Sequence, residues 1–282
     1  MDRSWHGLAV EARIRFLVGL GRAPSVEVDS GAGVTTVVTG VSDNTLNGVV
    51  HARLDPEGAD AVITATVERF QRRQAPAIWW LDPSSTPADL PRRLEAAGLR
   101  PEDSGVVRGG PVERVLERTA AVLAAAGGSR AAPTGRPGGF IRPVRDPGDL
   151  DRWLAVAAAA WGDDPTGDLA RRRQLYLGLG LDPGAALQHW VAVAGDRTVG
   201  MASAFSAGRT VLLDHLEVAE EARRRGIGTA LLRTALADGQ ARGCRWAVLE
   251  PTPESAPFYD VLGLEVEPCR PGVEFYLPLE PA

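Results

Sequence analysis

The 282-residue sequence predicts an α/β (α+β) protein in which a mixed, mostly antiparallel sheet is flanked by helices. The fold class follows from the order of the expected strands and helices given below, and three observations indicate a globular chain of two domains. The composition, with 44% hydrophobic and 24% charged residues, is typical of a globular protein. The length suits about two domains. A Gly/Pro-rich stretch at 127–139 can hold neither helix nor strand, so we expect a linker there between domains 1–126 and 140–282.

In the first half, apolar residues recur at helical spacing in three segments, and one short apolar run predicts a buried strand. The expected elements are helices over 56–74, 88–97 and 114–126 and a strand over 77–81. Gly98 would end the second helix. This half contains no glycine-rich phosphate loop.

In the second half, strand-like segments separated by turns at Gly195 and Gly208 predict an antiparallel meander. Asp149 lies near the expected cap of the first helix. The expected strands are 140–144, 190–194, 199–206, 211–218, 244–250 and 273–279, and the expected helices are 149–161, 169–177, 226–241 and 254–261.

The composition excludes several functions. All 31 basic residues are arginine, so Schiff-base, pyridoxal and P-loop chemistry, which require lysine, are excluded. The net charge of −5 disfavours nucleic acid as a partner. No apolar run reaches the roughly 20 residues of a membrane span, and no signal peptide is recognisable, so we expect a cytoplasmic protein with no membrane partner. Cys244 and Cys269 lack metal-ligand spacing, and no metal is expected.

The most informative segment is a strand that leads into a loop containing Arg223, Gly226 and Gly228, after which a helix begins at once. Glycines let the backbone approach a ligand, and unpaired N–H groups at a helix N-terminus attract an anion. A pyrophosphate would fit this junction. For the two glycines alone, packing beside solvated arginines would be the simpler interpretation.

The surrounding sequence resembles the acyl-CoA-binding signature of the GNAT superfamily of N-acyltransferases, in which Val-x-Pro-Glu-x-Arg-Gly-x-Gly-Ile-Gly follows a strand. The matching residues are Val218, Glu221, Arg223, Arg225, Gly226, Ile227 and Gly228. Glu220 and Arg224 stand where Pro and Gly are common. The stretch from Tyr259 to Leu264 is similar to the family's Tyr-x-x-x-Gly-Phe, and the resemblance covers residues 140–279.

This resemblance implies an acetyl-CoA-dependent N-acetyltransferase that acetylates a primary amine of a small molecule or peptide by direct attack. It implies that pantetheine follows the backbone from Leu216 to Val218 and that amides from Arg225 to Thr229 hold the pyrophosphate. The implied CoA-binding residues are Leu216, Val218, Arg223, Arg225, Gly226, Ile227, Gly228 and Thr229.

A protonated amine must lose a proton before it attacks a thioester, so a base is expected near the end of the strand. Asp214 is the first candidate, because on an alternating strand it shares a face with Leu212 and Leu216. Glu217 and His215 would point to the opposite face unless a bulge re-aims them. A structural role for Asp214 is the alternative.

Tyr259 stands where the family's tyrosine protonates the departing CoA thiolate, and a buried structural tyrosine is the alternative.

Two other functions of the protein remain open. One is a non-catalytic acyl-CoA-binding regulator on the same fold. The other is an NAD-dependent oxidoreductase, since the glycines follow a strand and Glu250 lies about 20 residues later, as a ribose contact would require. Leu231 at the third glycine position and the meander argue against it.

Residues 40–100 resemble the degenerate partner domain of tandem GNAT proteins. This resemblance rests on Leu46-Asn47, on Trp79-Trp80 and on the residue spacing within 87–99. Because this domain lacks the glycine loop, the resemblance implies that it binds no CoA and instead scaffolds or shapes the acceptor site. A fragment of residues 136–282 should then keep its CoA affinity. The acidic second domain favours a cationic amine acceptor, and a homodimer is left open.

Overall fold

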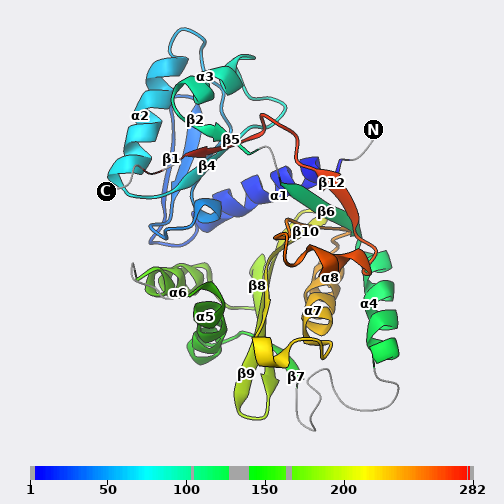
Figure 1. Cartoon of the computed structure of the whole chain (residues 1–282). Helices are drawn as coiled ribbons and strands as arrows, with labels where there is room; N and C mark the ends of the chain where they lie inside the picture. The colour runs from blue at the N-terminus through cyan, green and yellow to red at the C-terminus, as the bar shows by residue number, and fades with distance from the viewer. Residues whose placement is uncertain (1–3, 103–104, 127–139, 163–166, 278, 280–282) are drawn as a thin grey trace. The chain divides into compact units, whose positions relative to one another are not determined.

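The computed structural model describes residues 4–102, 105–126, 140–162, 167–277 and 279, and the predicted linker at 127–139 lies outside them. The chain forms two compact units, each built on its own sheet (Figure 1). Unit 1 comprises Met1–Ala12, Val106–Pro165 and Gly180–Glu267, and unit 2 comprises Arg13–Gly105, Thr166–Leu179 and Pro268–Ala282. The units interleave along the sequence, so their limits differ from the predicted domains 1–126 and 140–282.

Unit 1 contains a seven-stranded sheet with the order β12-β6-β11-β10-β9-β8-β7. The pairs β7–β8, β8–β9 and β9–β10 are antiparallel, which confirms the predicted meander. The pair β10–β11 is parallel. The strands are β6 (Val106–Pro111), β7 (Phe140–Pro143), β8 (Leu187–Ala194), β9 (Arg197–Ala207), β10 (Thr210–Val218), β11 (Trp246–Leu249) and β12 (Glu265–Pro268).

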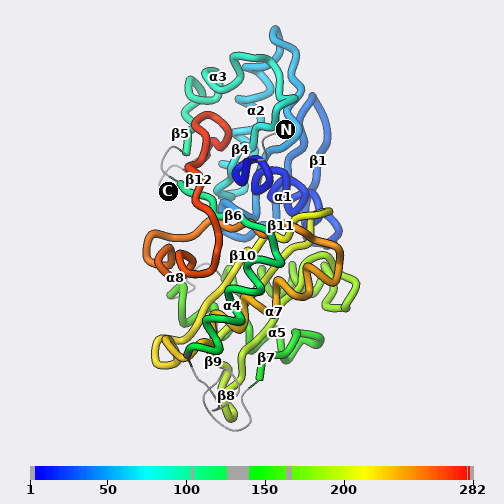
Figure 2. The backbone as a smooth tube through the Cα atoms, turned by 90° about the vertical axis from the view of Figure 1, so that its right-hand side faces the viewer, coloured from blue at the N-terminus to red at the C-terminus, as the bar shows by residue number. Residues whose placement is uncertain are grey.

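Helices cover both faces of this sheet. One core joins the sheet to α4 (Val112–Ala126), α7 (Ile227–Ala241) and α8 (Ala256–Asp260). Figures 1 and 2 show α4 alongside α7, where the Arg233 guanidinium donates to the Leu116 carbonyl. On the other side, α5 (Pro147–Trp161) packs on β8 and β9, and Trp153 Nε1 donates to the Ala202 carbonyl at 3.1 Å. The cap of α5 is Asp146, whose carboxylate accepts from the Asp149 amide at 2.9 Å.

Unit 2 contains a six-stranded sheet with the order β1-β2-β3-β4-β13-β5. Helix α1 (Trp5–Leu20) contributes its first residues to unit 1 and the rest to unit 2. The other elements are β1 (Glu27–Gly31), β2 (Val34–Val38), η1 (Asn44–Leu46), β3 (Gly48–Val50), α2 (Ala59–Arg72), β4 (Ala77–Trp80), α3 (Leu90–Ala96), β5 (Arg100–Pro101), α6 (Asp168–Leu179) and β13 (Glu274–Leu277).

Each sheet includes a strand from the opposite half of the sequence. In unit 1, β6 pairs antiparallel with β11, and Arg108 lies opposite Leu249. In unit 2, the last strand, β13, pairs with β4 and β5, which come from the first half of the sequence. Helix α4, predicted in the first domain, contributes Val112 and Val115 to the core of unit 1. Periodicity along a strand identifies its buried face but not the strand it pairs with.

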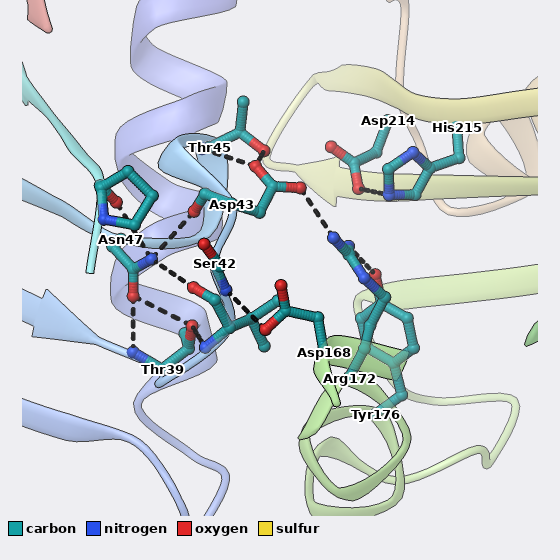
Figure 3. Close-up of polar contacts among 12 residues, drawn as sticks. Thr39, Ser42, Asp43, Thr45, Asn47, Asp168, Arg172, Tyr176, Asp214 and His215 are labelled. Carbon is teal, nitrogen blue, oxygen red and sulfur yellow. Dashed lines mark hydrogen bonds and ion pairs between the residues drawn. The ribbon is translucent and has the colours of Figure 1, made fainter. Parts of the chain in front are cut away.

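Helix α6, predicted in the second domain, belongs to unit 2, where polar contacts fix it to the loop before β3 (Figure 3). The buried Arg172 guanidinium donates to the Asp43 carboxylate at 2.7 Å and to the Tyr176 hydroxyl at 3.2 Å. Fully buried Asn47 organises the same loop, since its side chain accepts from the Thr39 amide at 2.8 Å and donates to three carbonyls.

Among the residues that the structure describes, no helix is long and apolar enough to cross a lipid bilayer.

Candidate functional site

The junction between β10 and α7 presents backbone donors at a helix start. Gly226 caps α7 in the left-handed conformation, with φ of 77° and ψ of 0°. The first helical hydrogen bond runs from the Ala230 amide to the Gly226 carbonyl at 2.9 Å. The amides of Ile227, Gly228 and Thr229 therefore precede it, and helix geometry leaves such donors without intrahelical partners. The first turn of α7 contains no acidic residue, so this end of the helix favours an anion.

Neighbouring side chains enclose this loop. Arg223 Nε donates to the Val218 carbonyl at 3.1 Å, which ties the exposed arginine across the loop. A Cβ atom at Gly226 would lie 3.1 Å from Leu123 Cδ2 of α4. A Cβ atom at Gly228 would lie 3.6 Å from the Phe258 ring of α8, an ordinary contact. The loop thus lies beside α4, which comes from the first half of the sequence.

The strand before the loop leaves one edge open. Within the described residues, β10 pairs with β11 only from Thr210 to Leu212. Beyond Leu212, β10 continues to Val218 with β9 as its strand partner. An extended, amide-bearing chain can bond to such an edge as an added strand would. The segment predicted to hold pantetheine, Leu216 to Val218, lies in this unpaired part.

A bulge in β10 changes which side chains share a face. The register with β9 shifts between Leu213 and His215, so Asp214 is the extra residue. Leu213 and Leu216 then both pack on the α4/α7 core, and His215 lies on the opposite face, against α5. The expectation that Leu212 and Leu216 share a face was therefore wrong.

Asp214 and His215 are in contact within this bulge (Figure 3). His215 Nε2 lies 3.2 Å from Asp214 Oδ2, and the Asp214 side chain is only 3% exposed. The His215 ring also lies against two indoles of α5, with centroids 5.6 Å from Trp153 and 5.0 Å from Trp161. The bulge thus joins an acid and an imidazole in an aromatic environment beside the open edge of β10.

Tyr259 and Glu217 have perturbed acidities. Tyr259 on α8 is buried, and burial raises the pKa of its hydroxyl well above the ordinary value. The Glu217 carboxylate raises this pKa further, whereas the Arg108 guanidinium lowers it. Burial also raises the pKa of Glu217 itself, against the opposing charge of Arg223. The Tyr259 hydroxyl is therefore protonated at neutral pH, and burial and Glu217 make it a weaker proton donor, which Arg108 partly offsets.

The equivalent place in unit 2 is filled by the chain itself. Strand β3 pairs in parallel with β4 only at Gly48 and Val49, within the described residues. Past that point, Thr86 donates its amide to the Ala52 carbonyl and accepts from the Leu54 amide, each at 3.1 Å. The first turn of α2 also contains Asp60, whose charge disfavours an anion. In the described part of unit 2, the junction between β3 and α2 therefore has neither the open edge nor the anion-binding helix start found in unit 1.

Comparison with known proteins identifies the family. Residues 151–264 match the model of the acetyltransferase (GNAT) family. This segment belongs to that family. The two mixed, mostly antiparallel sheets of the chain form a tandem GNAT fold. No curated protein matches the chain.

Several solved structures share the fold over most of the chain. The GCN5-related N-acetyltransferase from Kribbella flavida has 18% identity and a TM-score of 0.61, with 95% of each chain covered. A tandem GNAT protein from the clavulanic acid biosynthesis pathway has 15% identity and a TM-score of 0.54, covering 94% of this chain and 86% of that one. A functionally unknown conserved protein from Staphylococcus epidermidis has 15% identity and a TM-score of 0.54, covering 90% and 93%.

All the residues predicted for the site lie in unit 1, along β10, the following loop, the first turn of α7, and α8. Sequence reasoning missed Arg108 and Leu123, which reach this region from β6 and α4. No local signal could have found them, because their partners lie in the other half of the chain. The sequence allowed for a bulge in this strand but did not indicate its position, which the structure places at Asp214.

Proposed function

We propose that the protein is an acetyl-CoA-dependent N-acetyltransferase that acetylates a primary amine of a small molecule or peptide. One observation carries the proposal. The unpaired edge of β10 leads directly to the glycine start of α7, with buried Tyr259 in the adjoining core. An open strand edge suits pantetheine, and free amides at a helix start suit a pyrophosphate. Family membership supports the same assignment.

In this proposal, the chain holds the cosubstrate mainly through its backbone. Leu216 to Val218 bond the pantetheine amides, and the amides from Arg225 to Thr229 bind the pyrophosphate. Arg223 and Arg225 add positive charge beside it. Bound acetyl-CoA supplies an activated acyl group as a thioester.

Two groups can take the proton from the acceptor. Asp214, in contact with His215, lies in the β10 bulge. Glu217 lies further along the strand, and its raised pKa brings it closer to the range of an effective base near neutral pH. Tyr259, which is protonated at neutral pH, gives a proton to the departing sulfur. The acidic groups around the bulge favour a cationic amine as acceptor.

The alternatives differ in what they require. An NAD-dependent oxidoreductase needs a parallel, doubly wound sheet, whereas β7 to β10 are antiparallel. A non-catalytic acyl-CoA-binding regulator would use the same loop and strand edge. Turnover distinguishes it from an enzyme.

The test is a transfer assay with acetyl-labelled acetyl-CoA and a panel of polyamines, aminoglycosides and peptides with free N-termini. We expect label to appear as an amide on at least one amine at a rate that saturates with acetyl-CoA. The matched control is the Tyr259→Phe variant, which should bind acetyl-CoA but transfer slowly. Tight binding of acetyl-CoA with no transfer to any amine would favour the regulator.

A further inference from the structure

We propose that Arg108, on a strand supplied by the first half of the chain, is a positioning residue that stabilises the negative charge passing between the CoA sulfur and the Tyr259 hydroxyl. The inference rests on the proposed function and extends it to a residue outside the matched family region.

Arg108 lies where the open edge begins. It pairs with Leu249, the residue of β11 immediately after Val248, which forms the last pair with β10. Its neighbour two positions on, Gly110, faces the α4 and α8 side, since a Cβ atom there would meet the Gly263 carbonyl and the Leu264 and Val115 side chains. Strand alternation places the Arg108 side chain on the same side.

The Arg108 guanidinium is buried, but its ion-pair partner is exposed to solvent. The Arg108 side chain is 6% exposed, and its Nη2 donates to Asp260 Oδ1 at 2.6 Å. Asp260 is 61% exposed, so its charge is screened by water. Arg108 Nε is buried and has no hydrogen-bond partner. A buried cation whose partner faces solvent is destabilising for the fold, which points to a use elsewhere.

The positive charge of Arg108 acts on the hydroxyl of Tyr259. It precedes Asp260 on α8, and the Arg108 guanidinium lowers the pKa of the Tyr259 hydroxyl against the effects of burial and Glu217. Arg108 thereby lowers the free energy of an anion at this position.

An anion forms near Arg108 at one step of the proposed reaction. The neutral amine forms a C–N bond to the acetyl carbon, and its surplus proton goes to the base. The C–S bond breaks with its electron pair on sulfur, which takes the Tyr259 proton. The products are the amide and CoA thiol; the base then releases its proton to solvent, and the tyrosinate regains one from solvent. Negative charge thus moves from sulfur to the Tyr259 oxygen near Arg108, and a fixed charge stabilises such a step without reorganisation.

The test compares full-length Arg108→Gln, Arg108→Lys and Asp260→Asn. The readouts are CoA release from acetyl-CoA, with the best amine of the panel or with water, and calorimetric acetyl-CoA affinity. We expect Arg108→Gln to lower kcat about tenfold or more, equivalent to about 1.4 kcal/mol, with affinity changed less than twofold. Arg108→Lys should recover part of the loss. Asp260→Asn should stay near wild type, because it breaks the ion pair but keeps the charge.

A double-variant cycle shows whether Arg108 acts through Tyr259. In a Tyr259→Phe background, Arg108→Gln should lower kcat no further. An equal loss in both backgrounds, wild-type kcat in Arg108→Gln, or an equally slow Asp260→Asn would overturn the inference. If Arg108→Gln does not fold, Arg108→Lys and Asp260→Asn still decide it. Wild-type protein that fails to bind acetyl-CoA, or binds it without releasing CoA faster than buffer, would end the proposed function as well.

Discussion

The glycine that starts α7 offers a sharp test of the loop, because its conformation can be perturbed by a single methyl group. At φ of 77°, an alanine at position 226 is strained by about 1–2 kcal/mol. The added Cβ would also lie 3.1 Å from Leu123 Cδ2, so the neighbour must shift slightly. Relief of this strain would turn the amides that follow. We expect Gly226→Ala to weaken acetyl-CoA binding at least tenfold, about 1.4 kcal/mol.

Gly195 provides the matched control. It also has a positive φ, 61°, in the turn between β8 and β9, and a Cβ atom there would meet nothing within 4 Å. Gly195→Ala should therefore lose a similar free energy of unfolding, about 1 kcal/mol, but keep wild-type acetyl-CoA affinity. Chemical denaturation measures the first quantity and calorimetry the second. If folded Gly226→Ala binds acetyl-CoA as tightly as Gly195→Ala does, the loop is not the pyrophosphate site.

Three further predictions follow from the two units. Tyr259→Phe should lower kcat by about 10² to 10⁴ with little change in KM for acetyl-CoA, because the hydroxyl acts as the thiolate leaves; wild-type kcat in steady-state assays would make its role structural. A fragment of residues 136–282 lacks β6 and α4, so, contrary to the expectation from the sequence, it should lose cooperative unfolding and CoA affinity; a fragment with wild-type affinity would contradict the interleaved units. In unit 2, burial raises the pKa of Asp43, but the Arg172 guanidinium and Thr45 hydrogen bonds outweigh it and hold that pKa below its usual value. The resulting stabilisation is complete above about pH 4 and is lost as the pH falls through the folded-state pKa. Asp43→Asn should therefore destabilise unit 2 by about 3–5 kcal/mol at pH 7 and flatten this acid dependence in denaturation curves; unchanged stability would refute the assignment.

The sequence predicted the positions of helices and strands better than it predicted which strands pair with each other. The meander and α7 agree with the structure to within a few residues, because their apolar periodicity is strong and glycine turns separate them. Strand β6 was missed, since Gly109 and Gly110 weaken its pattern. Gly109 is required by packing, because a Cβ atom there would lie 2.4 Å from the Trp5 ring. Only the fold shows why a glycine pair sits in a central strand.

In the candidate site, too, local features could be predicted from the sequence, and features that depend on strand pairing could not. The loop from Arg223 to Gly228 is local, so its geometry followed from the sequence. The face of Asp214 depended on a bulge whose position strand alternation does not reveal. Arg108 could not be found, because its role depends on pairing between distant halves of the chain.

The most direct test of the account is the number of acetyl-CoA molecules bound per chain, measured by titration calorimetry on the full-length protein. Unit 1 has an open edge on β10 and a free helix start, whereas Thr86 fills the equivalent edge in unit 2. The account therefore predicts one equivalent per chain, abolished or strongly weakened by Gly226→Ala. No binding, or two equivalents per chain, would contradict it.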